Sequence, residues 1–287
     1  MDDIIIHTNK YHVSIIKPKK KHFIFDLDET LGSFSDMYLL WKGIGVITNN
    51  KKNDITLNGE LFNNILNLYP EFLRYGISTI LEYLHYKQKK KQCGKVYIYT
   101  NNQCDPPWIE HIIAYLEEEF NLKGLFENPI CAFKINNKPI DLRRTSHEKN
   151  YSDFLKCTLL SKSAELCFID DAFFPKMQTD QVFYIQPKPY HHSLDTNEIV
   201  HRFISSDINQ TTFFISKIEL LEWFKQNGSF NKSTKSRIDA ERDIEISRKI
   251  MYTIREFFYL ILKKEKTRRN LYLYNKMKFT RKHFLKF

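Results

Sequence analysis

The sequence predicts an α/β protein, a three-layer sandwich with a central, mostly parallel sheet and a basic helical C-terminal extension. Short apolar runs typical of buried strands alternate with segments whose apolar residues recur at helical spacing. Three of these runs end in small polar or acidic residues, as strands do at the ligand-binding edge of an open α/β sheet. We therefore expect a polar lead-in (1–21), an α/β domain (22–215) and a basic, amphipathic helical tail (216–287).

The composition fits one α/β domain with an appendage. The 287 residues are 42% hydrophobic and 15% aromatic, which is enough to fill such a core. No apolar run approaches about 18 residues and the first residues lack a signal-peptide pattern, so we expect a soluble, intracellular protein, cytoplasmic or nuclear. Five cysteines without a Cys-x-x-Cys pair favour reduced thiols and argue against zinc.

The first predicted strand, residues 23–25, follows a basic cluster at 17–21 that we interpret as a solvated flank rather than a nuclear address. Asp26 and Asp28 come directly after this strand. Residues two apart in extended backbone point to the same side, so both carboxylates can face one site. Two carboxylates at such a short distance repel each other, so a cation is expected between them. Mg²⁺ is a natural candidate, because it binds carboxylate and phosphate oxygens together. The alternative is an Asp/Thr-rich turn that caps a helix.

Residues 33–58 show no clean period, and we expect a loop or small hairpin near this site. Its aromatic residues Phe34, Tyr38 and Trp41 either line the site or pack beneath the loop.

The remaining segments alternate between helix and strand. Residues 58–91 predict two helices, residues 96–99 a second strand that ends in Thr100, and residues 107–120 a helix with proline near its first turn. A third strand, 166–169, ends in Asp170 and Asp171, and residues 182–185 predict a further strand. This order implies a parallel sheet between two helical layers.

The order Asp-x-Asp, Thr, Asp-Asp resembles the haloacid dehalogenase (HAD) superfamily of phosphohydrolases, whose fold is Rossmann-like. The spelling Asp-Leu-Asp-Glu-Thr-Leu at 26–31 is similar to the NLI-interacting-factor-like branch, which includes protein phosphatases acting on the RNA polymerase II tail. Within that branch, the runs at 99–103, 168–171 and 279–282 are similar to members carried by large DNA viruses. The resemblance covers about residues 20–205 and would place the protein in a virus-infected host cell.

The resemblance implies a role for each matching residue. Asp26 would be the nucleophile, and Asp28 the general acid and then the general base. Mg²⁺ would be held by Asp26, the backbone carbonyl of Asp28 and Asp170, with Asp171 acting through water. Thr100 would hydrogen-bond a phosphoryl oxygen.

A lysine that neutralises the phosphoryl group should precede Asp170 by one helix, and Lys149 and Lys156 both have suitable spacing. We favour Lys149, because it lies just before an apparent helix start with Ser152 as a plausible N-cap.

Positive charge is concentrated in the C-terminal segment. Residues 228–287 hold 17 Lys/Arg against 6 Asp/Glu, and the rest of the chain 27 against 28. Residues 238–262 predict a long amphipathic helix, and residues 263–287 interleave basic with aromatic side chains. That mixture suits nucleic acid, an anionic membrane or an acidic protein. A helix docked on the domain with a solvated basic face is the alternative.

The function predicted from these motifs is a Mg²⁺-dependent phosphatase that forms an aspartyl-phosphate and acts on protein phosphoserine or phosphothreonine. The enzymatic rival is a polynucleotide 3′-phosphatase, although that group usually has glycine at the place of Glu29. The rival from another class is a non-catalytic scaffold, which has no chemical need of clustered carboxylates.

Overall fold

The computed structural model describes residues 3–8, 11–13, 20–52, 55–228 and 236–262. The strands are β1 Ile4–His7, β2 Tyr11–Val13, β3 Lys21–Phe25, β4 Cys93–Ile98, β5 Lys134–Ile135, β6 Lys138–Pro139, β7 Glu165–Ile169, β8 Val182–Pro187 and β9 Leu260–Leu262. The α-helices are α1 Ser35–Asn50, α2 Gly59–Leu66, α3 Ile77–Lys89, α4 Pro106–Glu119, α5 Tyr151–Thr158, α6 Thr196–Ser205, α7 Lys217–Asn227 and α8 Arg237–Phe257. Short 3₁₀ turns span Pro70–Phe72 and Pro175–Met177, and a π-helical turn spans Asn209–Phe213.

The central sheet has the strand order β1-β8-β7-β3-β4. Strands β4, β3, β7 and β8 run parallel, and β1 pairs antiparallel with β8 at the edge. Because β3 and β7 are neighbours in register, with Phe25 opposite Ile169, the residues that follow them emerge side by side. The structure confirms the predicted fold class.

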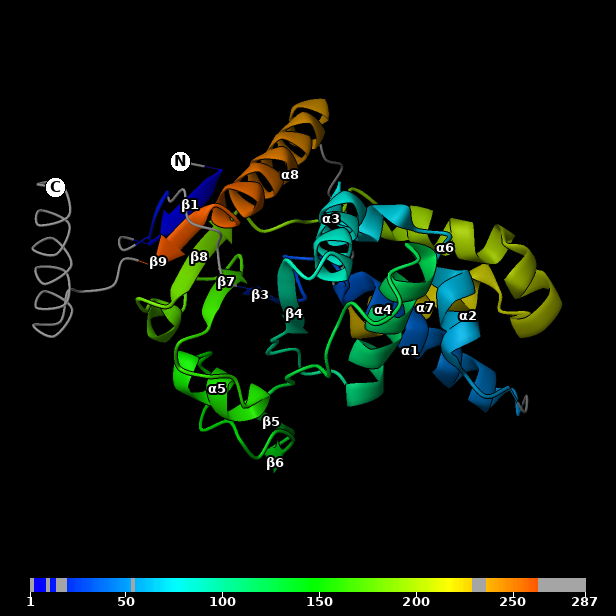
Figure 1. Cartoon of the computed structure of the whole chain (residues 1–287). Helices are drawn as coiled ribbons and strands as arrows, with labels where there is room; N and C mark the ends of the chain where they lie inside the picture. The colour runs from blue at the N-terminus through cyan, green and yellow to red at the C-terminus, as the bar shows by residue number, and fades with distance from the viewer. Residues whose placement is uncertain (1–2, 9–10, 14–19, 53–54, 229–235, 263–287) are drawn as a thin grey trace, which may run out of the picture.

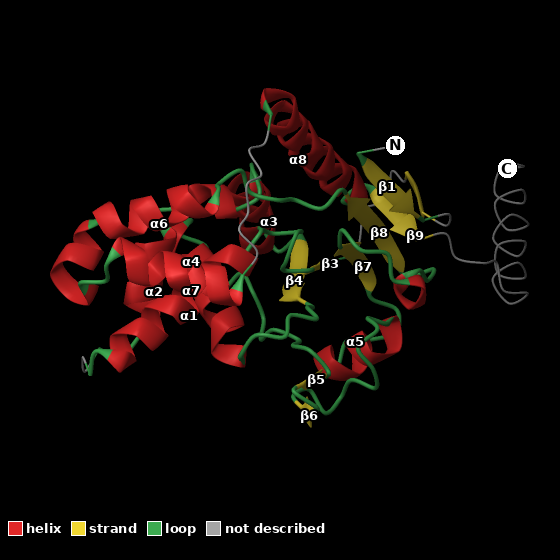
Figure 2. Ribbon diagram, turned by 180° about the vertical axis from the view of Figure 1, so that it is seen from behind, coloured by secondary structure: helices red, strands yellow, loops and turns green. Residues whose placement is uncertain are grey.

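Successive strand residues face two separate apolar layers. Phe23 and Phe25 pack with the large helical side that includes α1, α3, α4 and α8, whereas Ile24 packs with Phe154 of α5. This alternation is what a sheet buried on both faces requires. Figure 1 shows α8 lying across one side of the sheet and α5 on the other, with most remaining helices gathered beyond β4. The same order is visible from behind in Figure 2.

Residues 33–58 contain the helix α1, so the prediction of a loop or hairpin there is wrong. The buried side chains Met37, Leu40 and Ile44 recur at helical spacing. Gly43 lies inside this helix, and a Cβ there would lie 2.5 Å from Cδ1 of Trp223 in α7. Close packing of two helices therefore explains a residue that reads as a helix breaker.

The N-terminal segment also differs from the prediction. Residues 4–7, expected in a polar lead-in, form the edge strand β1. Lys21, expected in a solvated flank, is buried at the start of β3 and pairs with Glu165 (2.8 Å). The three domain ranges themselves stay a prediction.

Helix α8 begins the C-terminal region and covers the sheet near β8 and β1. Its buried residues Ile250, Ile254 and Phe257 join the main core, and the Phe257 ring stacks on Phe183 at 5.0 Å. The amphipathic helix predicted at 238–262 is thus largely present, and it is docked on the domain. The basic and aromatic residues 263–287 lie outside the described residues, so their nucleic-acid or acidic partner stays a prediction. Within the described part of the chain, no helix is both long and apolar enough to cross a membrane.

Candidate active site

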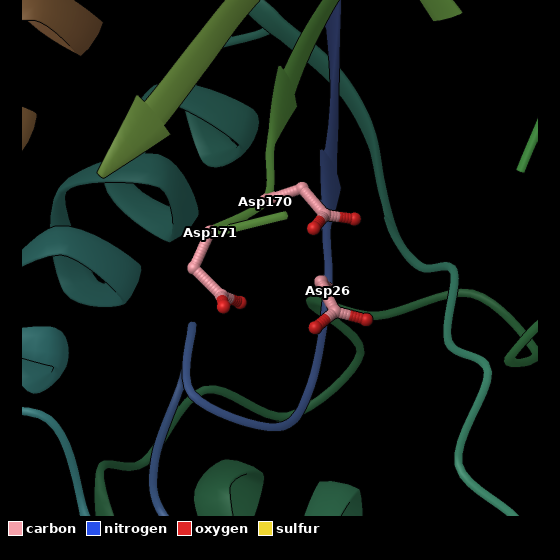
Figure 3. Close-up of side chains that lie close together, drawn as sticks. All are labelled: Asp26, Asp170 and Asp171. Atoms are coloured by element: carbon pink, nitrogen blue, oxygen red, sulfur yellow. The ribbon is translucent and has the colours of Figure 1, made fainter. Parts of the chain in front are cut away.

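Three carboxylates meet at the carboxyl edge of the sheet. Asp26 follows β3 directly, and Asp170 and Asp171 follow β7. The backbone amide of Asp26 donates to the carbonyl of Ile169 (2.9 Å), which keeps the two strands together up to the site. The three side chains each offer an oxygen within 4.8 Å of the others, and Figure 3 shows them gathered at the two strand ends.

Asp28 lies beside this cluster. Its carboxylate accepts a hydrogen bond from Nδ2 of Asn102 (2.7 Å), in the loop after β4. The backbone amide of Asn102 in turn donates to the hydroxyl of Thr100 (2.9 Å). Asp26, Asp28, Thr100 and Asp170 line one cavity of about 230 Å³, which we call the catalytic cavity. The residues predicted from separate motifs therefore share one site.

Of the two candidate lysines, Lys149 lies in this site. Its Nζ donates to Asp26 Oδ1 and to Asp170 Oδ2 (2.6 Å for the latter), and its side chain is 2% exposed. Lys156 is 54% exposed and pairs with Asp153 (3.3 Å). Burial disfavours the charged ammonium of Lys149, but the two carboxylates outweigh this cost and raise its pKa.

Lys149 is positioned by the start of α5. The N-cap of this helix is Asn150, whose side chain accepts from the Asp153 amide (2.8 Å). The expectation that Ser152 would be the N-cap is therefore wrong by two residues, since Asn is an equally good capping residue and stood closer to Lys149.

The carboxylates of the site are poorly compensated. Burial raises the pKa of Asp170 to about 8, and the neighbouring Asp26 adds to this effect against the opposing charge of Lys149. Burial raises the pKa of Asp28 to about 6, offset in part by the hydrogen bond from Asn102. Burial, followed by the charge of Asp26, also raises the pKa of Asp171. Among the described residues, five acidic side chains, Glu29 included, thus line the catalytic cavity, which holds one buried lysine.

This surplus of negative charge fits a hard divalent cation. Carboxylate oxygens are the ligands that Mg²⁺ prefers, and those of Asp26, Asp170 and Asp171 are close enough to share one ion. The side chain of Asp28 lies outside that group of three, and a metal-binding role for its backbone carbonyl stays a prediction. The donor set therefore fits magnesium.

Two buried arginines that were not predicted from the sequence hold the loops of the site. Arg74 is 1% exposed and donates to the backbone carbonyls of Glu29, Thr30 (2.6 Å) and Lys188 (2.9 Å). Arg144 donates to the carbonyl of Thr100 (2.9 Å). Neither arginine lies within a recognisable motif. Each binds backbone carbonyls, which every residue has, so the sequence of the bound loops does not indicate the contact.

Two further residues could have been found from the motifs. Thr30 donates its hydroxyl to Asp171 Oδ1 (2.9 Å) and accepts from the Asp171 amide (3.0 Å), which ties the loop after β3 to that after β7. Thr30 and Asn102 lie within the motifs that carry Asp26 and Thr100. Both are polar residues close to predicted site residues in the sequence, and this could have indicated them.

No protein-family model and no curated protein matches the sequence. Among the solved structures that do match, the HAD-hydrolase YfnB from Bacillus subtilis bound to magnesium is 12% identical and covers 55% of this chain and 80% of its own, with a TM-score of 0.28. A phosphoserine phosphohydrolase-like protein from Francisella tularensis is 18% identical, with coverages of 54% and 79% and a TM-score of 0.28. At such scores we assign no family from these superpositions.

Proposed function

We propose that the protein is a Mg²⁺-dependent phosphomonoester hydrolase of the HAD type that works through an aspartyl-phosphate. The observation that carries this proposal is the convergence of Asp26, Asp170 and Asp171 around the buried Lys149 at one edge of the sheet. A carboxylate nucleophile can attack an anionic phosphate only where cations screen the approach. The motif spelling at 26–31 supports the same assignment.

Hydrolysis would proceed in two steps. A carboxylate oxygen of Asp26 attacks phosphorus while the bond to the leaving oxygen breaks, and Asp28 gives that oxygen its proton. Asp28 then takes a proton from a water molecule, whose oxygen attacks phosphorus and releases Asp26 and inorganic phosphate. Burial raises the pKa of Asp28, which favours the protonated form that the first step needs.

The other residues bind and orient the phosphoryl group. Lys149 offsets the charge of phosphate and nucleophile, and Thr100 donates to a phosphoryl oxygen. When bound, Mg²⁺ would neutralise phosphoryl charge and hold the group in line. It would be held by Asp26, Asp170 and the backbone carbonyl of Asp28, with Asp171 acting through water.

We propose a protein phosphoserine or phosphothreonine as the substrate. The support is the resemblance of residues 26–31 to the NLI-interacting-factor-like branch. The resemblance to viral members of that branch and a nuclear or host-cell location stay predictions. A polynucleotide 3′-phosphatase is the second candidate, favoured by the positive charge of residues 228–287.

The test is release of phosphate by the full-length protein with Mg²⁺ and with EDTA. We expect turnover of p-nitrophenyl phosphate only with Mg²⁺, and its loss in Asp26→Asn and Asp28→Asn. Phosphoserine peptides and 3′-phosphorylated oligothymidylate, compared by kcat/KM, separate the two enzyme classes. Failure to hydrolyse any of these compounds with Mg²⁺ would favour a non-catalytic scaffold.

A further inference from the structure

A second cavity of about 310 Å³, which we call the aromatic pocket, adjoins the catalytic cavity. The two cavities share Asp28, Glu29 and Asn102 in their linings. In the proposed reaction Asp28 protonates the leaving oxygen, so the atoms bonded to that oxygen lead toward the aromatic pocket. The pocket is therefore placed to contact the part of the substrate that leaves.

Three aromatic residues line the pocket, and of these Tyr38 is partly exposed whereas Phe34 and Trp108 are buried. Phe34 and Tyr38 come from the start of α1, and Trp108 from the first turn of α4. The Tyr38 and Trp108 rings meet edge to face with centroids 5.0 Å apart, and Trp108 is 3% exposed. The wall is thus packed from behind by two helices before any ligand binds, which lowers the cost of ordering it.

The lining of the pocket is acidic rather than basic, and burial raises the pKa of Glu29 to about 7. Its acidic lining residues are Asp28 and Glu29, and none of the described residues that line it is a lysine or arginine. At its rim, Lys42 lies 5.3 Å from the Tyr38 ring centroid and pairs with Asp105 (2.7 Å), so this pair adds no net charge. Aromatic faces beside carboxylates attract organic cations.

Glu29 is the carboxylate available to such a cation. Asp28 is engaged by Asn102 (2.7 Å), whereas the half-buried Glu29 side chain makes no hydrogen bond or ion pair within the described residues. The Glu29 backbone has φ +56° and is fixed by its carbonyl, which accepts from Arg74 and from the Tyr190 amide (2.8 Å). Glycine would adopt this conformation without strain, so the backbone does not require glutamate here.

We propose that the aromatic pocket binds a lysine or arginine side chain next to the phosphorylated residue of a peptide substrate, with Glu29 as its carboxylate partner. This inference rests on the proposed function and narrows its substrate class. An oligonucleotide is disfavoured, because its further phosphates would lie near Asp28 and Glu29 without a lining cation. Magnesium would offset charge at the transferred phosphoryl group, in the other cavity.

The first test uses phosphoserine pentapeptides that carry arginine, alanine or glutamate immediately before or after the phosphoserine. For the full-length protein with Mg²⁺, we expect kcat/KM about tenfold higher with arginine than with alanine at one of these positions, and lowest with glutamate. In Glu29→Gln, which keeps the shape and removes the charge, the arginine preference should largely disappear. The matched control is Glu82→Gln, an exposed change on α3 that should keep the preference.

A binding measurement separates failure of this inference from failure of the proposed function. Fluorescence anisotropy with full-length Asp26→Asn, in which no turnover is expected, reports the affinity for each labelled peptide. An arginine preference here that Glu29→Gln abolishes supports the pocket even if no peptide is hydrolysed. Equal affinity for the three peptides, or a preference that survives Glu29→Gln, would overturn it even if hydrolysis occurs. Tighter binding of 3′-phosphorylated oligothymidylate than of every peptide would also overturn it.

A structural role for Glu29 makes a different prediction from a role in binding. Glu29→Gly relaxes the left-handed backbone, so its melting temperature should equal or exceed that of the wild type. The same variant should lose the arginine preference. A lower melting temperature together with a retained preference would show that Glu29 supports the fold rather than the substrate.

Discussion

The acidic residues at the carboxyl edge of the sheet and Asp3 at the contact between β1 and α8 have opposite electrostatic environments. Asp3 accepts from Lys249 Nζ (2.7 Å) and Arg242 Nε (2.9 Å), and these hydrogen bonds, the one from Lys249 first, lower its pKa to about 2. Burial instead raises the pKa of Asp170 to about 8. Two cationic side chains, Lys249 and Arg242, bind the single carboxylate of Asp3. At the carboxyl edge of the sheet, acidic side chains of the described residues outnumber the one lysine among them that lines the catalytic cavity. A persistent deficit of positive charge marks where a ligand is expected.

The largest effect should follow from removing the only cation of the site within the described residues. Lys149→Met should lower kcat for p-nitrophenyl phosphate by about a hundredfold to a thousandfold, because it removes a preorganised charge at the phosphoryl group. Lys156→Met is the matched control, since that side chain is exposed and pairs only with Asp153 among the described residues. Similar losses in both variants would mean that Lys149 has no special role.

The next effect concerns Mg²⁺ itself, measured as stability rather than activity. Saturation to about a hundred times the dissociation constant should raise the free energy of unfolding by about 2.7 kcal/mol, seen as a higher urea midpoint than in EDTA. Asp170→Asn should reduce this gain, whereas the exposed Asp207→Asn should keep it. An identical midpoint with Mg²⁺ and EDTA would contradict a cation site.

The smallest effect on stability should come from Asp3, which is paired with Lys249 and Arg242, and this effect should depend on pH. The folded pKa of Asp3 lies below its ordinary value of 3.8, so its stabilisation is present above about pH 4 and is lost as the pH falls toward 2. Asp3→Asn should therefore lower stability slightly at pH 7 and have little effect near pH 2. Urea unfolding of both proteins across this range measures the difference. A difference that grows at low pH would reverse the assigned sign.

The same comparison explains what could be predicted from the sequence. Asp26, Thr100 and Asp170 each end a short apolar run, and parallel strands bring such ends to one edge, so local pattern was enough. Lys149 lies outside those strands; its spacing before Asp170 left Lys156 as an alternative, and the apparent helix start after Lys149 favoured it.

Features set by distant packing could not be predicted in this way. The edge strand β1 is four residues long and pairs with β8 across most of the chain, so no local period indicated it. Helix α1 contains Gly43, which disfavours a helix locally and is accommodated by close contact with Trp223 of α7. Arg74 binds the backbone carbonyl of Glu29, whose backbone is left-handed. Every residue has a backbone carbonyl, so the sequence around Glu29 did not indicate this contact.

The pairing of β1 with β8 has a consequence for folding during synthesis. β1 leaves the ribosome long before β8 exists, and α8, which covers both strands, is made later still. The antiparallel pairing of β2 with β9 closes this region only when the segment after α8 has emerged. Until β8 has emerged, β1 offers unpaired amides and carbonyls to other chains. Association between nascent chains should therefore begin at β1, at the edge of the sheet.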